Sequence, residues 1–498
     1  MRFLPALLLI CTLPLAARAG LKAGFAERDI TPAIGMEVPG GYGKSFSKRI
    51  HDPCKARAAV FDDGEQRVAL VGLDALIVPR SVVLEARRTI QERCGIPPEN
   101  VMIGASHSHS SGPIGMVQPG EFDHASDLAK DLAYNKSSCA DAGYLTIVRE
   151  AIVEAVVVAN EARSEATAGF GTGLEDQVAF NRRLRMKNGL SFSHPGKGNP
   201  DNAEFAGPTD PQVGVIGVWN PEGKLLGCVV NFACHATTSG PWISANWIFY
   251  LERAIQGFFG PEAKVVFLQG ACGDVTQVNN LDPHANPESD AWAQFVGGRV
   301  GAEAVKVLLG MSQTRVAEVP IAAQQKTWSI PRRGPAPERV TAAVELAAQD
   351  PKTAGPDWVW AKETVLLDAL IAREPSVEVE VQAIQIGPAI CISNPAEYFC
   401  AYGLQLKAQS GFPITFPVEL ANGCVGYVPT EEAFGPHGGG YETRLTSYSN
   451  LEITAGTQFL NAGLELARRL KPMPLPERPM APPFKQGWLY GNQPPQLR

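Results

Sequence analysis

The chain has 498 residues, of which 45% are hydrophobic and 19% charged, and its formal net charge is −7 at neutral pH. This composition is that of an ordinary globular protein and argues against a disordered or fibrous chain. The acidic charge argues against nucleic acid or an anionic membrane as the main partner.

The first nineteen residues predict a secretory leader. Arg2 supplies the positive start, residues 3–15 an apolar core, and Ala17-Arg18-Ala19 a small-x-small cleavage pattern. The alternative is a retained membrane anchor, but this segment is short for a span, and no other stretch is long and apolar enough to cross a bilayer. We expect a secreted or periplasmic protein without a stable membrane span, whose net charge becomes −9 when Arg2 and Arg18 are removed.

The rest of the chain predicts one large domain, at 20–472, followed by a Pro-rich arm at 473–498 that extends along the surface. Nine of the ten cysteines lie after the leader, so at least one is unpaired. Their spacing matches no disulfide framework and no Cys-x-x-Cys zinc ribbon, and it assigns no pairing.

Apolar runs alternate with amphipathic stretches along the chain. We expect helices at 81–94, 141–163, 292–309, 396–408 and 451–470, and strands at 67–73, 101–104, 213–219, 228–233, 262–269, 377–386 and 389–393. Residues 331–373 are expected to form an insertion or a lid. The alternation predicts an α/β fold of mixed β-sheets flanked by helices.

Polar clusters of small residues follow three of the predicted strands. His107 and His109 follow the strand at 101–104, His235 follows 228–233, and Gly273-Asp274 follows 262–269. Loops beyond the carboxyl ends of strands are where open α/β sheets build sites, so we expect these clusters to converge. In an extended backbone His107 and His109 point to one face, and imidazoles suit zinc. The alternative is a polar loop with two exposed histidines.

Five ordered motifs resemble the neutral (alkaline, non-lysosomal) ceramidase family. They are Ala105-Ser-His-Ser-His-Ser-Ser-Gly-Pro113, Asn231-Phe-Ala-Cys-His-Ala-Thr-Thr238, Gly273-Asp-Val-Thr276, Ala396-Glu-Tyr398 and Gly426-Tyr-Val428. The resemblance spans residues 24–470 and covers the amino-terminal catalytic domain of that family only. It therefore implies that 20–472 is one zinc-hydrolase catalytic domain of a distant bacterial-type member.

The resemblance implies a set of zinc ligands, with one Zn²⁺ per chain: His107, His235, Glu397 and Tyr427. Two imidazoles and a carboxylate form an open zinc site, and a phenolic oxygen can serve as a weaker fourth ligand. Taken singly, His235 fits a hydrogen-bonded strand-end histidine, Glu397 a helix-start carboxylate and Tyr427 an ordinary core residue. Another divalent metal is an alternative to zinc.

The same resemblance implies roles for five further residues: His109, Arg182, Thr276, Tyr441 and Asp274. His109 would shuttle a proton, Arg182 and Tyr441 would stabilise an oxyanion, and Asp274 would orient a ligand imidazole.

Each of these assignments has an alternative. For Arg182 it is a solvated surface charge, with Arg183 or Arg185 facing inward, and for Tyr441 an exposed tyrosine. Thr276 replaces a serine of the family motif. It would hydrogen-bond substrate or metal-bound water, or alternatively act as a covalent nucleophile.

The resemblance implies a hydrolase of sphingolipid metabolism, an amidase in which hydroxide on the zinc ion attacks the carbonyl of ceramide or another N-acyl lipid. Thr276 and the following Gln277-Val278 depart from the family motif where substrate would sit. A hydrolase of a carbohydrate derivative, an ester or a small polar amide is the alternative. A third hypothesis is a non-catalytic exported binding protein with a degenerate site.

Overall fold

The computed structural model describes residues 20–240, 242–484, 487 and 494–498. The predicted leader at 1–19 lies outside the described residues.

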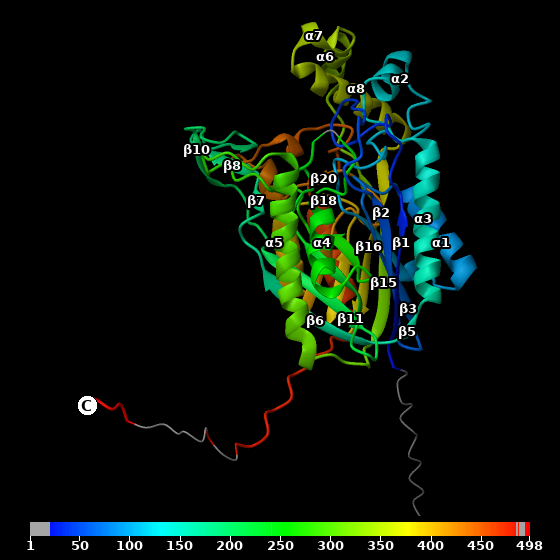
Figure 1. Cartoon of the computed structure of the whole chain (residues 1–498). Coiled ribbons are helices and arrows are strands. Elements are labelled where there is room, and N and C mark those ends of the chain that lie inside the picture. Colours follow the sequence, from blue (N-terminus) through cyan, green and yellow to red (C-terminus); the bar gives the residue numbers. More distant parts are fainter. Residues whose placement is uncertain (1–19, 241, 485–486, 488–493) are drawn as a thin grey trace, which may run out of the picture.

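Three mixed sheets form the body of the molecule (Figure 1). The first has the order β4-β3-β2-β1-β5 and contains β1 (Lys22–Asp29), β2 (Lys55–Asp62), β3 (Arg67–Leu73), β4 (Val101–Ala105) and β5 (Ser164–Glu165). The second, β13-β12-β11-β6, contains β6 (Thr167–Leu174), β11 (Gln212–Trp219), β12 (Leu225–Phe232) and β13 (Lys264–Gln269). The third, β15-β16-β17-β19, contains β15 (Ile321–Pro331), β16 (Ser376–Ile386), β17 (Ala389–Ser393) and β19 (Ile414–Val418).

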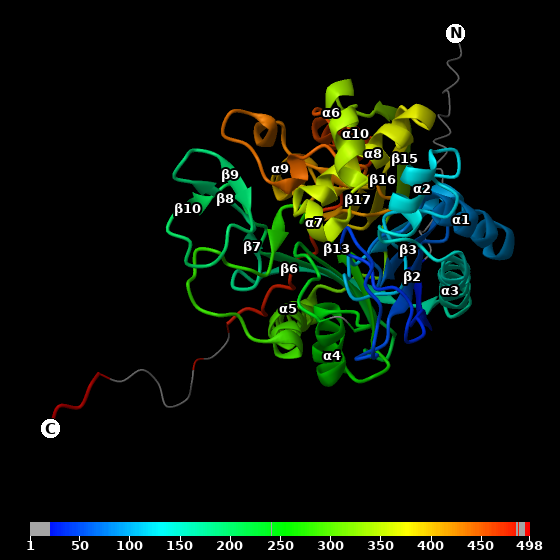
Figure 2. The same ribbon diagram turned by 90° about the horizontal axis from the view of Figure 1, so that it is seen from above.

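Each sheet is covered on one face by a pair of helices. The pairs are α1 (Arg80–Cys94) with α3 (Ala142–Glu161), α4 (Trp247–Phe259) with α5 (Ser289–Gly310), and α9 (Cys400–Gln409) with α10 (Ala455–Arg468). Seen from above, these pairs lie on different sides of the molecule (Figure 2). The predicted α/β class of mixed sheets flanked by helices is therefore confirmed.

The other faces of the three sheets meet in one central core. In β2, Ala58 and Val60 pack under the helices, whereas Ala59 and Phe61 point into the central core. In β12, Val230 likewise packs under the helices, whereas Val229 points into the central core. This two-residue period is the normal alternation of a strand, and it explains why these strands are apolar on both faces.

Two buried ion-pair groups join neighbouring layers. Arg57 of β2 binds Glu252 of α4 at 2.8 Å and Asp74 at 2.6 Å. Arg87 of α1 binds Glu380 of β16 at 2.9 Å. Each pair thus connects the first sheet or its helix to another layer.

A helical insertion sits above the sheets and packs apart from them (Figure 1). It contains α6 (Pro337–Ala347), α7 (Pro351–Ala354) and α8 (Asp357–Arg373), which pack with α2 (Asp127–Tyr134) in a separate apolar cluster. Pro331 and Ser376, which flank the insertion, are paired across β15 and β16. The predicted insertion at 331–373 therefore lies within the loop that connects the two strands of one β-hairpin, β15 and β16.

Short elements complete the described chain. The strands are β7 (Phe180–Asn181), β8 (Arg183–Met186), β9 (Ser191–Ser193), β10 (Asn202–Phe205), β14 (Val275–Thr276), β18 (Glu397–Tyr398) and β20 (Tyr427–Val428). Four 3₁₀ turns are η1 (Pro98–Asn100), η2 (Met311–Gln313), η3 (Glu431–Phe434) and η4 (Tyr441–Thr443).

The predicted strands and helices agree with the observed ones to within a few residues, with one exception. The helix predicted at 396–408 begins only at Cys400, because Glu397 and Tyr398 pair with Tyr427 and Val428 in a small parallel sheet. The strands β1, β2, β6, β15 and β19 were not predicted.

The Pro-rich arm also differs from expectation. Residues 472–484 carry no helix or strand and are largely exposed, and Figure 1 shows this stretch leading away from the body rather than along its surface.

The nine described cysteines are all free thiols. No helix among the described residues has the length and apolarity needed to cross a bilayer.

Candidate metal centre

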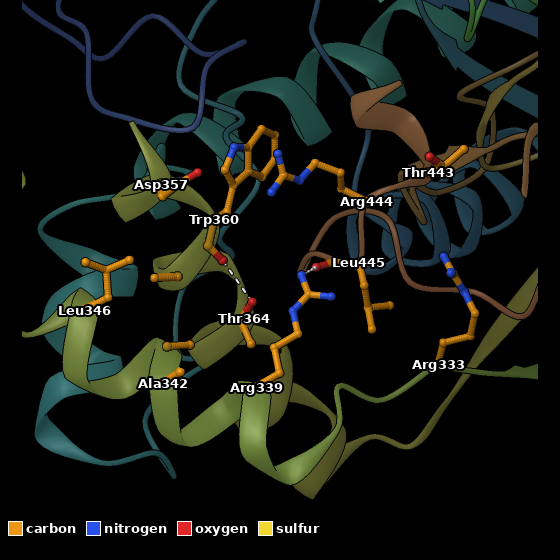
Figure 3. A pocket seen from close by; sticks show the side chains of 12 residues that line it. Arg333, Arg339, Ala342, Leu346, Asp357, Trp360, Thr364, Thr443, Arg444 and Leu445 are labelled. Atoms are coloured by element: carbon orange, nitrogen blue, oxygen red, sulfur yellow. Dashed lines mark hydrogen bonds between the residues drawn. The ribbon is translucent and has the colours of Figure 1, made fainter. Parts of the chain in front are cut away.

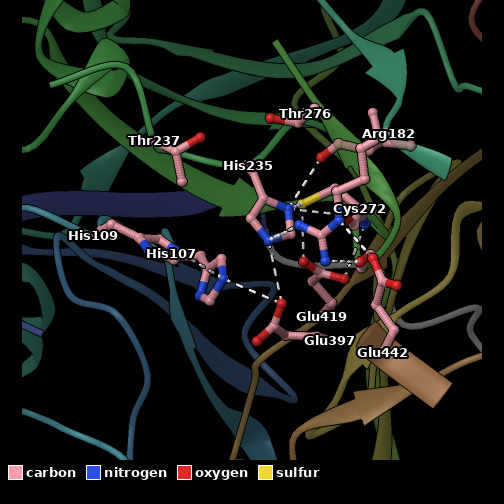
Figure 4. A network of polar contacts seen from close by, with 12 residues as sticks. His107, His109, Arg182, His235, Thr237, Cys272, Thr276, Glu397, Glu419 and Glu442 are labelled. Carbon is pink, nitrogen blue, oxygen red and sulfur yellow. Dashed lines mark hydrogen bonds and ion pairs between the residues drawn. The ribbon is translucent and has the colours of Figure 1, made fainter. Parts of the chain in front are cut away.

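Each of the three large sheets contains one parallel strand pair, and the carboxyl ends of these pairs supply the site. His107 follows β4, His235 follows β12, and Glu397 follows β17. Convergence at the carboxyl ends of parallel strands is the arrangement that open α/β sheets use for ligand sites. Figure 4 shows the three side chains directed toward one another.

His107 and His109 meet, but not in the way the sequence suggested. The backbone at His107 is left-handed, with φ of 60°, so the segment is not extended there. A non-glycine residue in this region is uncommon and is found preferentially at functional sites. The turn still brings Nε2 of His109 to 3.1 Å from Nε2 of His107.

Hydrogen bonds to backbone carbonyl groups orient the rings of His107 and His235. Nδ1 of His107 lies 2.9 Å from the Leu76 carbonyl oxygen, and Nδ1 of His235 lies 2.8 Å from that of Cys272. A carbonyl oxygen only accepts, so each Nδ1 carries the hydrogen, and each ring in its neutral form presents a bare Nε2. This is how metal-binding histidines are oriented.

Glu397 presents an oxygen to both bare nitrogens. Its Oε2 lies 3.3 Å from Nε2 of His107 and 3.2 Å from Nε2 of His235. Among the described residues no donor hydrogen-bonds this buried oxygen. The Glu397 oxygen thus lies beside two imidazole nitrogens without a donor of its own, and a cation would satisfy it. Nε2 of His235 also accepts from Arg182 at 2.9 Å, a hydrogen bond that metal binding would displace.

The spacing also fits a small tetrahedral ion. Ligand atoms about 2.0–2.1 Å from a tetrahedral zinc lie about 3.3 Å apart, close to the distances from Glu397 Oε2 to the two imidazoles. Two imidazoles and a carboxylate are the donor set of several catalytic zinc sites. The residues present thus fit a zinc-like ion.

The protonation states fit a metal site at two of the three residues. At His107, burial lowers the pKa of the ring, but the Glu397 carboxylate outweighs burial and raises that pKa above its ordinary value. Burial and the Arg182 charge lower the pKa of His235 to about 3, which keeps its ring neutral. Burial alone would raise the pKa of Glu397, but His107 and His235 outweigh it and hold that pKa well below its usual range. A neutral imidazole and an ionised carboxylate are the forms that bind metal.

His109 lies as close to this point as a ligand would. Ring nitrogens of His107, His109 and His235 all lie within 4.8 Å of one another. Burial, followed by the neighbouring His107 and His235, lowers the pKa of His109 well below its usual value, so this ring is neutral. The geometry therefore allows His109 to be either a third imidazole ligand or a base beside the metal.

Tyr427 lies in the same cluster through its pairing with Glu397 across β20 and β18. Its ring is 5.7 Å from that of Tyr441, and the Arg182 guanidinium lies 5.3 Å from its centre. Tyr427 and Tyr441 therefore both face the site.

Of the three candidate arginines, Arg182 is the one beside the metal ligands. It is 2% exposed and donates to Glu442 at 2.8 Å, to Nε2 of His235 at 2.9 Å and to the Gly273 carbonyl oxygen at 2.7 Å. Arg183 is also buried but binds the Gly439 carbonyl, and Arg185 pairs at the surface with Glu204 and Glu432.

Asp274 does not contact an imidazole, contrary to the role inferred for it. Its carboxylate accepts from the Asn181 amide at 2.7 Å and from the Cys400 backbone at 2.8 Å. The carbonyl oxygens of Cys272 and Val275 orient His235 instead. Asp274 thus braces the loops that carry Arg182 and Glu397 rather than a ligand ring.

The ligand candidates line a cavity of about 470 Å³. Thr276, Val278 and Tyr441 line it as well, together with side chains for which the sequence predicted no role: Tyr42, Leu76, Met116, His194, Thr237, Trp292, Trp360 and Tyr448. The cavity combines aromatic and apolar walls with a polar floor, as small-molecule sites do.

Gly40 and Glu419 are two residues near the site that the sequence analysis did not identify. Gly40 opens a glycine-rich stretch before Tyr42, and a Cβ at Gly40 would lie 2.4 Å from Nδ1 of His109, so this glycine gives the histidine its space. Glu419 had no signal. It is fully buried beneath the site, where it accepts from Cys272 and Tyr398, and burial raises its pKa to about 8.

No protein-family model matches the chain. A curated neutral ceramidase of Pseudomonas aeruginosa is 26% identical over 340 residues, which are 62% of this chain and 46% of that protein. The aligned region is thus less than half the length of the curated relative.

Two solved structures share the fold. A neutral ceramidase of Pseudomonas aeruginosa matches with a TM-score of 0.67 and 20% identity, covering 93% of this chain and 76% of the other. A ceramidase complexed with C2 also gives a TM-score of 0.67, with 18% identity and coverage of 93% and 77%. The chain is thus similar in sequence, over part of its length, to a neutral ceramidase, and it shares the fold of the two solved ceramidase structures.

Proposed function

We propose that this protein is a zinc-dependent hydrolase that cleaves the amide bond of ceramide or another N-acyl lipid. The observation that carries the proposal is the meeting of His107, His235 and Glu397, in which Oε2 of Glu397 lies 3.3 and 3.2 Å from Nε2 of the two imidazoles and has no hydrogen-bond donor among the described residues. The similarity to neutral ceramidases supports the same reaction class.

His107, His235 and Glu397 would hold one zinc ion per chain, with Tyr427 or His109 beside them. When bound, such an ion lowers the pKa of water and polarises a carbonyl. His109, kept neutral by its low pKa, would take up a proton and return it to the leaving amine.

Two tyrosines would stabilise the negative charge that develops on the carbonyl oxygen, and Arg182 would support the site beside them. Burial raises the pKa of Tyr427 and Tyr441, so both hydroxyls keep their hydrogen at neutral pH and can donate it. Arg182 already makes three contacts, and its role would be to hold Glu442 and His235 in place while its charge faces the cavity.

Metal analysis and a substrate panel test this function. Purified protein should contain about one zinc per chain and should release fatty acid from a short-chain ceramide. Chelation should abolish this activity and added zinc restore it. The variants His107→Ala and His235→Ala should lose both metal and activity, whereas His284→Ala, an exposed histidine outside the site, should keep both.

Two results would contradict the proposal. Full zinc content in His107→Ala or His235→Ala, with circular dichroism unchanged, would show that the ion binds elsewhere. Turnover of esters or glycosides without turnover of any N-acyl amide would reject the reaction class.

A further inference from the structure

A second pocket, of about 700 Å³, opens between the helical insertion and the loop after η4 (Figure 3). Three arginines line it: Arg333 before α6, Arg339 within α6, and Arg444 in the loop. Asp357 is the one acidic residue among the lining residues. On a chain of net charge −7, this is a local concentration of positive charge.

The three guanidinium groups are not neutralised by carboxylates. Among the described residues, none of them has a carboxylate oxygen within 4.0 Å, whereas other arginines of the chain, such as Arg57 and Arg87, form such pairs. Arg333 donates to the Leu451 carbonyl oxygen at 2.7 Å, and Arg339 weakly to that of Leu445 at 3.4 Å. A guanidinium has five N–H groups, so most of these donors remain free for a ligand.

The surroundings hold these side chains without compensating their charge. The guanidinium of Arg444 stacks 4.1 Å from the Trp360 ring, and that of Arg333 lies 4.7 Å from the Phe434 ring. Burial lowers the pKa of both arginines from its usual range, and at Arg444 the charge of Asp357 offsets this effect only in part.

The pocket shares a wall with the cavity of the metal centre. Trp360 of α8 lines both spaces. The segment from Tyr441 to Tyr448 does so too, because its two tyrosines line the cavity while Thr443, Arg444 and Leu445 line the pocket. A ligand held by the arginines would therefore lie on the other side of this shared wall from the cavity of the metal centre.

We propose that this arginine pocket binds an anionic group, a phosphate or a carboxylate, carried by the head of the N-acyl substrate whose amide enters the cavity. Guanidinium groups bind such oxyanions by paired, charge-assisted hydrogen bonds. The substrate part of the inference rests on the proposed function. It extends that function by making the substrate an acidic N-acyl compound rather than a neutral one.

Binding of inorganic phosphate tests the anion site without any turnover. Calorimetric titration at low ionic strength should show saturable binding, and Arg339→Gln and Arg444→Gln should each weaken it about tenfold. The matched control is Arg253→Gln, since Arg253 is also exposed, also stacks on an aromatic ring and also lacks an ion pair among the described residues. Equal phosphate binding by all four proteins would overturn the site.

Turnover of a matched substrate pair tests the assignment to the substrate. An N-acyl amino alcohol should be cleaved with a kcat/KM about tenfold lower than that of its O-phosphate ester, mainly through KM. Arg339→Gln and Arg444→Gln should abolish this preference, and Arg253→Gln should keep it. Equal kcat/KM for the two substrates in the unaltered protein would overturn the substrate assignment.

The two proposals fail in different ways. Phosphate binding that depends on Arg339 and Arg444, with neither amide cleaved, would reject the proposed function and support the anion site. Cleavage of both amides without such binding would support the function and reject the site.

Discussion

Two alternative roles are open to Thr276, that of a covalent nucleophile and that of a hydrogen-bonding side chain. It is buried in the cavity wall, and among the described residues its hydroxyl bonds only to the Gln277 side chain, at 3.2 Å. A threonine nucleophile needs a base within hydrogen-bonding reach. The geometry therefore favours the hydrogen-bonding role.

We expect Thr276→Val to lower kcat by about tenfold or less, since one neutral hydrogen bond is lost, with no change in zinc content. Gln277 keeps its bond from Thr237 at 2.8 Å, so the wall stays in place. Thr276→Ser, which retains the hydroxyl, should retain activity. Rapid-quench mass spectrometry checks the assignment, because an acyl group trapped on Thr276 would establish the nucleophile instead.

Among the elements, the link between α1 and β16 predicts a specific pH dependence of stability. Glu380 is buried and is bound by both Arg87 and Arg80. Burial would raise its pKa, but the two arginines outweigh it and lower that pKa below the usual range. Its stabilisation is therefore fully present above the pKa of an unfolded glutamate, about 4.3, and is lost as the pH falls through the folded-state pKa.

We expect Glu380→Gln to lower the free energy of unfolding at pH 7 by about 3 kcal/mol, because Arg87 stays buried without its carboxylate. The difference from the unaltered protein should shrink as the pH falls below about 4.3. Urea unfolding at several pH values measures this. Glu378→Gln is the control, as Glu378 lies on the same strand and pairs with Arg80 but is largely exposed. Equal losses in the two variants would contradict the buried-pair explanation.

We expect the metal centre to form without the helical insertion. Arg332 bonds to Pro375 and Pro331 pairs with Ser376, so an Asn-Gly turn in place of 334–373 can close the β15–β16 hairpin. The shortened protein should bind zinc normally, because every ligand candidate lies outside the insertion. Its KM should rise about tenfold or more, since Trp360 no longer walls the cavity.

A point variant tests the same prediction in case the shortened protein misfolds. Removing the insertion exposes the apolar face of α2, including Leu132, and the shortened chain could aggregate for that reason. Trp360→Ala leaves the insertion packed and should also raise KM while zinc content stays unchanged. An unaltered KM in Trp360→Ala would show that this wall does not contact substrate.

At the scale of the whole molecule, export remains a proposal from the sequence. Expressed with its own leader in a Gram-negative host, the protein should reach the periplasm or the medium and begin at Gly20. Deleting residues 2–19 should keep it in the cytoplasm. Mass spectrometry of each fraction decides, and an intact leader on membrane-bound protein would favour the anchor instead.

The sequence by itself determined the strands that are apolar on both faces, such as β3 and β17, and the histidines that follow β4 and β12, because these patterns are local. It missed β1 and β15, whose alternation is interrupted by charged and small residues. It also wrongly began the α9 helix at Ala396, since helix propensity carries no information about the pairing of Glu397 with Tyr427.

Only the tertiary structure decided how the site is assembled. The left-handed turn at His107, the backbone carbonyls that orient His235, and the bracing role of Asp274 all depend on contacts between segments distant in the chain. The same holds for the pocket of Arg333, Arg339 and Arg444. Periodicity records which face of an element is buried, but not which other element it meets, and chemistry between elements is fixed only when they pack together.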